Sequence, residues 1–238
     1  MNSPEIYAVV FALGPGKKNV NVIWAGSDDG LIHVTRNGGQ TWTNVTPKDM
    51  PEFGRVSQID ASPFESGTAY VSVRRPLLDD LAPYIFRTTD YGRTWTKITN
   101  GIRPDAYVHA VRADPTRRGL LYAATQHGVY VSYTDGAGWT PLSLNLPDVP
   151  VADLAVQQNE LVIATHGRGF WVLDDIAALR QATPTVLACE HFTSLASISR
   201  LGTERASAPS VSTRLRLVWN ATDFSASGRI RIRPEYTD

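Results

Sequence analysis

The sequence predicts an all-β fold made of β-propeller blades, each a sheet of four antiparallel strands. The first observation is a repeated turn that ends in tryptophan, at Trp42, Trp95 and Trp139, with intervals of 53 and 44 residues. The second is the composition around each turn, where short runs rich in Val, Ile, Tyr, Thr and Trp are separated by Gly, Pro, Asp and Asn. A repeat of about 40–55 residues with four strand-like runs is typical of propeller blades, whereas a parallel β-helix has a shorter coil.

Three complete units follow one another, and we name the four strands of each unit A to D. Upstream of the turns, "VIWAGSDDGLIHV" and "LYAATQHGVYV" align closely, and the second unit shows the same pattern with a longer middle. Strands A to D are expected at 5–12, 20–26, 31–36 and 41–46 in the first unit, at 56–62, 68–74, 84–89 and 94–99 in the second, and at 107–113, 119–125, 129–134 and 138–143 in the third.

A fourth unit has the front half of the pattern but lacks the tryptophan turn. Its strands are expected at 150–157, 160–165 and 169–174. A short helix near 175–181 follows, with Asp175 as the N-cap and Arg180 near its C-terminus.

The composition changes after this helix, which suggests two regions, 1–181 and 182–238. The first region holds the blades, and the second begins as a stretch rich in Ser, Ala and Thr. Within this C-terminal tail, Arg alternates with apolar residues, which predicts a β-hairpin at 213–236. The order of the tail as a whole stays open at this point.

The repeated turn has a structural rationale. In the second copy the pattern is Thr-x-Asp-x-Gly-x-Thr-Trp, and the Asp side chain is expected to accept backbone N–H groups across the turn. The Gly supplies a positive φ, the Thr begins strand D, and the Trp buries a large ring between blades. The residues assigned these structural roles are Asn37, Gly39, Thr41 and Trp42, then Asp90, Gly92, Thr94 and Trp95, and finally Gly136 and Trp139.

This pattern resembles the Asp-box, or BNR repeat, of sialidases, xyloglucanase-type glycosidases, the sortilin propeller and a photosystem II assembly factor. Beyond the turn, "PYIFRTTDYGRTWTKIT", "LNLPDVPVADLAV" and "ATHGRGFWVLDDIAALRQ" look like the last blades of a large bacterial family of glycosyl-hydrolase-like or sortilin-N-terminal-like propellers. The resemblance covers residues 5–181. It implies that the Asp of the turn is structural, because in such proteins the Asp-box lies away from the ligand-binding face.

Four blades are at the lower end of the range for propellers. Propellers in the resembling family are larger, so the resemblance implies a fragment-like arc whose partners are the remaining blades of a longer chain or of a partner chain. A closed four-bladed ring is the alternative. The resemblance also implies an extracytoplasmic location, although the N-terminal stretch "MNSPEIYAVVFALGPGKKN" does not read as a signal peptide.

The composition excludes several kinds of function. Twenty-three Lys and Arg balance 23 Asp and Glu, which argues against a nucleic-acid platform. Cys189 is the single cysteine, and no Cys/His cluster has the spacing of a metal site, so neither a metal nor a cofactor is expected. No apolar run approaches the length of a membrane span.

The turns between strands B and C gather most of the unusual polar residues. If strand A is innermost, the B–C and D–A connections share one end of the blades, which we call the B–C face, and the repeated turns lie at the other. The longest B–C connection, at 74–83, would form a lip over a cleft. The candidate ligand-binding residues on this face are Asp28, Asp29, Arg74, Arg75, Asp79, Asp80, His127, His166 and Arg168.

The leading functional hypothesis is a module that binds a glycan or a protein through the B–C face, with no catalytic set evident. A fragment of a glycoside hydrolase of the sialidase or xyloglucanase type is the alternative if the chain is an enzyme, with a carboxylate pair drawn from the four aspartates of this face. A sortilin-like or assembly-factor-like scaffold that binds polypeptide is the third hypothesis. A cleft with two suitably spaced carboxylates would favour the enzyme, and a charge-mixed face would favour protein binding.

Overall fold

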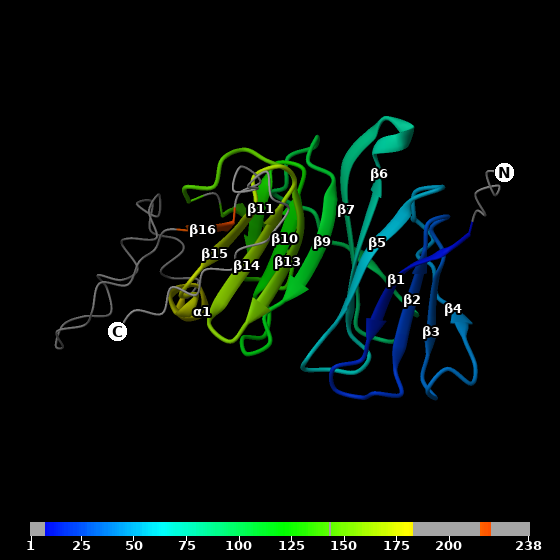
Figure 1. Cartoon of the computed structure of the whole chain (residues 1–238). Coiled ribbons are helices and arrows are strands. Elements are labelled where there is room, and N and C mark those ends of the chain that lie inside the picture. Colours follow the sequence, from blue (N-terminus) through cyan, green and yellow to red (C-terminus); the bar gives the residue numbers. More distant parts are fainter. Residues whose placement is uncertain (1–7, 143, 183–214, 220–238) are drawn as a thin grey trace, which may run out of the picture.

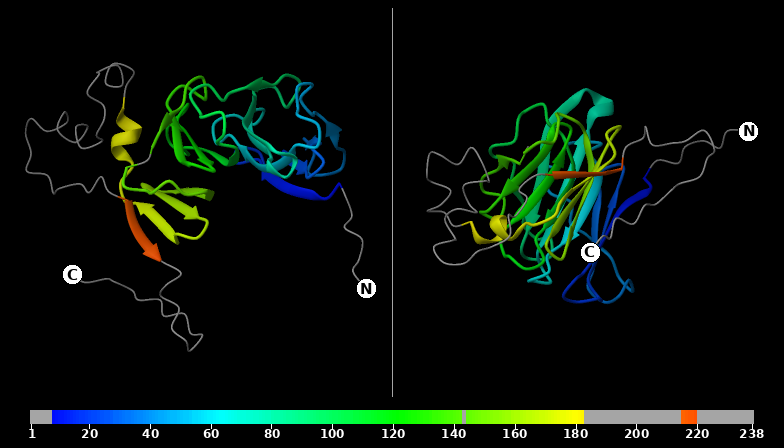
Figure 2. Two further views of the ribbon diagram at one scale, coloured as in Figure 1. Left: turned by 90° about the horizontal axis from the view of Figure 1, so that it is seen from above. Right: turned by 60° about the vertical axis from the view of Figure 1, so that its left-hand side comes forward.

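A computed structural model of the chain describes residues 8–142, 144–182 and 215–219. It contains four antiparallel sheets of four strands each, and they follow one another along the chain (Figure 1). Seen from above, the sheets stand side by side in an open arc (Figure 2). The fold is therefore the predicted one, a set of β-propeller blades, with one short α-helix among the described residues.

The elements have the following bounds in chain order. They are β1 (Val10–Pro15), β2 (Ile23–Ser27), β3 (Ile32–Thr35), β4 (Thr43–Asn44), β5 (Arg55–Ala61), β6 (Ala69–Arg75), the 3₁₀ helix η1 (Pro76–Leu78), β7 (Asp80–Thr88), β8 (Thr96–Lys97), β9 (Val108–Ala113), β10 (Leu121–Thr125), β11 (Gly128–Ser132), β12 (Thr140–Pro141), β13 (Val151–Gln157), β14 (Glu160–Thr165), β15 (Phe170–Leu173), α1 (Ala177–Gln181) and β16 (Leu215–Trp219).

Strand order within each sheet equals chain order, and neighbouring strands are antiparallel throughout. The first strands of the sheets, β1, β5, β9 and β13, all lie on the side that faces the viewer in Figure 1. The outermost strands are much shorter than predicted: β4, β8 and β12 have two residues each. In the first sheet the Val45 N–H donates to the Ile32 carbonyl at 2.8 Å just beyond β4, and the Thr46 hydroxyl accepts the Ile32 N–H at 2.9 Å in place of a backbone carbonyl.

The fourth sheet takes its outermost strand from a distant segment. Strand β16 pairs with β15 with Leu173 opposite Leu215 and Phe170 opposite Trp219. The rest of the hairpin predicted at 213–236 lies outside the described residues. The Asp175 carboxylate accepts the Ala177 N–H at 2.8 Å, but the N-cap position of α1 belongs to Ile176, one residue later than predicted.

Buried side chains fill the space between successive sheets. Successive residues of a strand point to opposite faces, so Phe86 of β7 packs toward the first sheet and Ile85 toward the third. The third and fourth sheets share a further cluster that includes Leu179 of α1. The inner sheets are therefore buried on both faces, which is why strands such as β10 and β11 read as continuous apolar runs.

The repeated turns are held by a shared set of hydrogen bonds. In the second copy, Asp90 accepts the Thr94 N–H at 2.9 Å and the Thr94 hydroxyl at 2.7 Å, while the Thr88 hydroxyl accepts the Gly92 N–H at 2.9 Å. Asn37 of the first copy accepts the Thr41 N–H at 3.0 Å in the same way. The side chain at this position therefore ties the start of the outer strand to the turn.

Each later tryptophan also reaches back to the preceding sheet. The indole N–H of Trp95 donates to the Val45 carbonyl at 2.6 Å, and that of Trp139 donates to the Ile98 carbonyl at 2.7 Å. Both acceptors lie three residues after the tryptophan of their own sheet, so the contact is the same one repeated.

Trp42 breaks this rule. We expected its ring to be buried between blades, but 43% of it is exposed, against 4% for Trp139. Because Trp42 lies in the first sheet, no earlier sheet among the described residues offers it a carbonyl. The outer flank of the first sheet, which also carries the exposed Leu13, is therefore uncovered by the described residues.

Candidate functional site

A cavity of about 340 Å³ opens where the first and second sheets meet, on the B–C face. Its lining combines residues from the two kinds of connection predicted for this face, the B–C turns within sheets and the D–A links between sheets. Asp28 comes from the β2–β3 turn, Phe53 from the link between the sheets, and Arg75 from the end of β6. The complete lining is Asp28, Phe53, Arg55, Arg74, Arg75, Pro76, Leu77 and Leu78.

The long β6–β7 connection forms a lip beside this cavity. Pro76 occupies the first turn of η1, where its fixed φ suits a helical start, and Asp79 ends η1 with a left-handed φ of 55°. The ion pair between Arg75 and Asp80, at 3.0 Å, closes the base of the lip. Its apolar side chains are left in solvent, and Leu77 is 85% exposed.

Two arginines form the charged wall of the cavity. Arg74 contacts Nδ1 of His109 through Nη1 at 2.9 Å, and the guanidinium of Arg55 lies over the Phe11 ring, 4.7 Å from its centroid. Burial lowers the pKa of Arg74, and the nearby charge of Arg55 lowers it further. Among the described residues, no carboxylate forms an ion pair with either arginine.

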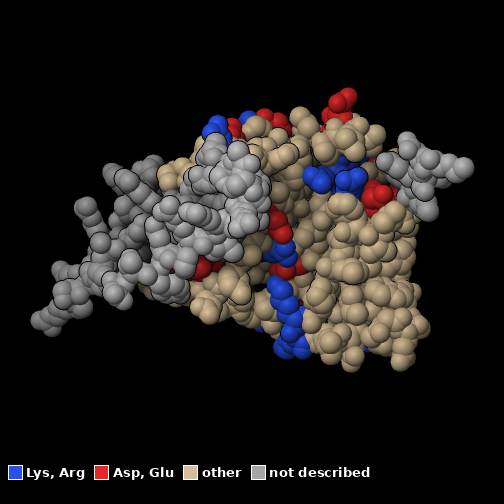
Figure 3. Space-filling view, in the orientation of Figure 1, with Lys and Arg blue, Asp and Glu red and all other residues tan. Residues whose placement is uncertain are grey.

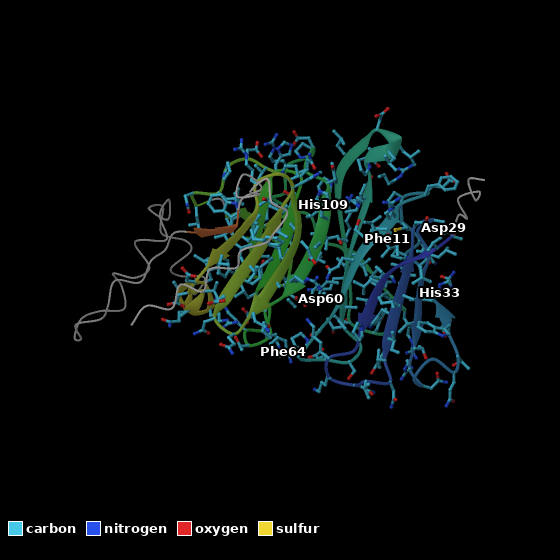
Figure 4. The ribbon with its side chains drawn as sticks, viewed as in Figure 1. Phe11, Asp29, His33, Asp60, Phe64 and His109 are labelled. Atoms are coloured by element: carbon cyan, nitrogen blue, oxygen red, sulfur yellow. The ribbon has the colours of Figure 1, made fainter. Side chains whose placement is uncertain are left out.

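His109 supports Arg74 from the inner strand β9. Burial, followed by the charge of Arg74, lowers the pKa of His109 to about 4. The imidazole is therefore neutral at pH 7, and its Nδ1 can accept the Arg74 hydrogen bond. Its ring stands 5.0 Å from the ring of Tyr107, and Figure 4 shows His109 on the inner side of the blades.

The aspartates of this face have local partners. Asp28 accepts the Val9 N–H at 2.8 Å, Asp29 accepts the Ser27 hydroxyl, and Asp80 accepts the Tyr84 hydroxyl at 2.8 Å as well as its bond from Arg75. Burial raises the pKa of Asp80, but the hydrogen bonds from Tyr84 and the Ala82 N–H, with the charge of Arg75, bring it below its usual value. A catalytic acid of a glycosidase needs the opposite shift.

The other predicted site residues lie elsewhere on the B–C face. His127 lies in the β10–β11 turn of the third sheet, and its Nδ1 is 3.0 Å from a carboxylate oxygen of Asp148, in the link to the fourth sheet. His166 and Arg168 are exposed in the β14–β15 turn, where the Arg168 carbonyl accepts the Trp171 indole N–H at 3.0 Å. Asp79 is exposed at the end of η1. Of the nine predicted residues, the cavity brings together only Asp28, Arg74 and Arg75.

Sequence reasoning missed the apolar half of the site and two of its polar groups. Phe53, Arg55, Leu77, Leu78 and His109 were not singled out. One signal was present, because two adjacent leucines in a strand connection are unusual among polar loop residues. Nothing in the sequence placed Phe53 or Arg55 beside that connection.

A second polar cluster runs down the inner strands, where basic and acidic side chains alternate in Figure 3. Asp60, whose side chain is 4% exposed, lies 2.9 Å from Lys17 and 3.7 Å from Arg112, and it accepts the Ala113 N–H at 3.0 Å. Arg112 in turn lies 2.9 Å from Asp153. These ion pairs link four successive inner segments, and their charges are balanced, so the cluster reads as structural.

Other kinds of site find no support in the part of the chain that the structure describes. Those residues contain no group of three or more His, Cys, Asp or Glu side chains placed to hold a metal ion. No helix in the described ranges has the length and apolar character needed to cross a bilayer.

No protein-family model matches the chain. A xyloglucanase of Hypocrea jecorina (strain QM6a) is 28% identical over 162 residues, which are 64% of this chain and 18% of that protein. The chain therefore spans less than a fifth of the length of this relative.

Solved structures share the fold at low sequence identity. YCF48 bound to D1 peptide is 18% identical with a TM-score of 0.53, over 71% of this chain and 52% of YCF48. The GH74 enzyme of Niastella koreensis is 19% identical with a TM-score of 0.53, over 69% of this chain and 22% of the enzyme. These similarities, together with the four sheets, show that the chain is built as a β-propeller scaffold.

Proposed function

We propose that the chain is a binding module that takes a polypeptide segment in the cavity of the B–C face. The observation that carries the proposal is the lining, in which exposed apolar side chains stand beside guanidinium groups. Contiguous exposed apolar side chains rimmed by charge are typical of protein-binding surfaces. The solved complex of YCF48 with a D1 peptide supports it, because a protein with this fold binds a polypeptide.

A selection from a displayed peptide library tests this proposal. The library is presented to the wild-type chain and to two variants with matched changes, Leu78→Asp in the cavity and Leu81→Asp outside its lining; Leu81 is 45% exposed and Leu78 52%. We expect sequences that wild type and Leu81→Asp enrich and that Leu78→Asp does not. Failure of the wild type to enrich any sequence, or equal enrichment by the Leu78→Asp variant, would refute the proposal.

A glycoside hydrolase is the second candidate, because the similarity to a xyloglucanase favours it. Local hydrogen bonds hold Asp28, Asp29 and Asp80, and the lowered pKa of Asp80 does not suit a general acid, so we expect no hydrolysis. Release of reducing ends from xyloglucan is the assay. Activity that Asp28→Asn or Asp80→Asn abolishes would favour the enzyme over the binding module.

We also propose that the repeated turns are Asp-boxes and that another blade of the same repeat covers the first sheet. Three facts support this interface: Trp42 is exposed, the flank is apolar, and the contact that Trp42 would make already occurs twice within the chain. The covering blade would carry an aliphatic residue three positions after its own turn tryptophan, and the carbonyl of that residue would accept the Trp42 indole N–H.

The test adds a copy of residues 51–104 in front of the full chain. An added blade that docks should shield Trp42 from acrylamide quenching and raise the melting temperature. Unchanged quenching of Trp42 in a folded extended chain would contradict the interface. A dimer of the unextended chain in which Trp42 is already shielded would show that a second copy covers the flank instead.

A further inference from the structure

The charged wall of the cavity bears positive charge that the described residues do not neutralise. Arg75 is paired with Asp80, whereas Arg55 and Arg74 have no carboxylate partner there. The neutral His109 accepts a hydrogen bond from Arg74 but supplies no counter-charge. Arg55 and Arg74 lie directly opposite each other in the pairing of β5 with β6, so their side chains share one face of the sheet. Two adjacent guanidinium groups form a site where an anion is stabilised, and the charge of Arg55 also lowers the pKa of Arg74.

The two arginines are also held in place without an anion. Arg55 is stacked on Phe11, and the partly buried Arg74 is fixed by His109, which itself packs against Tyr107. A ligand carboxylate would therefore meet donors that are already oriented, and little side-chain entropy would be lost on binding. Figure 3 shows basic side chains gathered in the upper half of the inner side, with acidic side chains beside them.

The remaining lining limits what can stand next to that carboxylate. Phe53, Pro76, Leu77 and Leu78 provide an apolar surface adjoining Arg74 and Arg75. A ligand that fills the 340 Å³ needs an anionic group and a bulky apolar group within one or two residues of each other. The carboxylate of Asp28 on the same lining disfavours a densely charged polyanion.

We infer that the cavity recognises an acidic polypeptide segment in which a carboxylate pairs with Arg55 and Arg74 beside a large aliphatic or aromatic side chain. This inference rests on the proposed function and names its ligand class. The carboxylate belongs either to an Asp or Glu side chain or to the end of a polypeptide, since both offer the same oxygen acceptors.

The experiment uses the peptides selected by the wild-type chain. Binding of a fluorescent copy is measured by anisotropy for the selected peptide and for its Glu→Gln or Asp→Asn counterpart, each with a free and an amidated C-terminus. We expect the acidic form to bind about tenfold or more tightly, as the loss of a hydrogen bond to a charged group implies. The terminus comparison tells which carboxylate is bound.

Three variants of the full chain locate the effect. Arg55→Gln and Arg74→Gln should each reduce the preference for the acidic peptide, whereas Arg93→Gln, an exposed arginine of the repeated turn, should leave it unchanged. Arg55→Gln keeps the Arg74–His109 contact, so one variant remains informative if the other fails to fold.

The possible outcomes distinguish the proposed binding function from the inference about the class of ligand. Selected peptides without acidic residues, or equal binding of the acid and the amide, would overturn the inference while leaving the binding function in place. An anionic oligosaccharide of glucuronate that binds the cavity in preference to the peptides would overturn it in favour of a glycan. A selection that yields no peptide would overturn both.

Discussion

Alanine substitutions at two equivalent glycines test how the sheets pack. Gly92 and Gly39 occupy the same place in the repeated turn, with φ of 82° and 95°. Alanine at such a φ costs about 1–2 kcal/mol in either turn. The difference lies outside the turn: a Cβ on Gly92 would stand 2.6 Å from the Val45 Cβ, whereas a Cβ on Gly39 would have no atom within 4 Å.

The extra contact sets the expected magnitude. Forcing a methyl group into a packed interface costs about 1–3 kcal/mol in addition to the backbone term. We therefore expect Gly39→Ala to lower the free energy of unfolding by about 1–2 kcal/mol and Gly92→Ala to lower it by about 2–5 kcal/mol. Gly136→Ala should resemble Gly92→Ala, because its Cβ would stand 2.3 Å from the Ile98 side chain.

Urea unfolding of the full chain, followed by circular dichroism, gives the three free energies. A Gly39→Ala variant that is as unstable as Gly92→Ala would refute the open flank of the first sheet, since something would then occupy the space beside Gly39. A Gly92→Ala variant that costs no more than the backbone term would refute the packing of Val45 against the turn.

Three further predictions concern single side chains. The unfolded chain takes up the His109 proton near pH 6.5 and the folded chain only near pH 4, so stability should fall as the pH drops through this window, and His109→Gln should reduce the slope of a melting-temperature profile. Trp139→Phe leaves the Ile98 carbonyl without its donor and should cost about 1–3 kcal/mol in urea unfolding, whereas Trp42→Phe should stay within about 0.5 kcal/mol; equal costs would contradict the interface rule. Asp90→Ala should cost about 1–2 kcal/mol in the same assay and Asp90→Asn much less, because Asn37 accepts the same N–H in the first turn; an Asn variant as unstable as the Ala variant would contradict that equivalence.

The sequence predicted the sheets because their signals are local. The turn pattern, the strand composition and the spacing all lie within about 50 residues, so each blade could be recognised by itself. The features that the sequence did not predict depend on contacts with other sheets or with distant segments of the chain. The exposure of Trp42 follows from the absence of a preceding sheet among the described residues, and the pairing of β16 with β15 joins segments about 40 residues apart.

The candidate site was predicted in outline only. Topology placed the B–C connections on one face, and Asp28, Arg74 and Arg75 do line the cavity there. The same reasoning grouped His127 and His166 with them, although each belongs to its own sheet. Phe53 and Arg55 escaped prediction because strand periodicity does not report how a link between sheets folds back onto a neighbouring turn.

Hydrogen–deuterium exchange with a selected peptide tests the central claim, binding at the cavity of the B–C face, most directly. The account predicts slower exchange at residues 53–55 and 74–80 when the peptide is bound, with no change at the repeated turns, 35–42 and 88–95. Protection confined to the repeated turns, or no protection near η1 at saturating peptide, would contradict it.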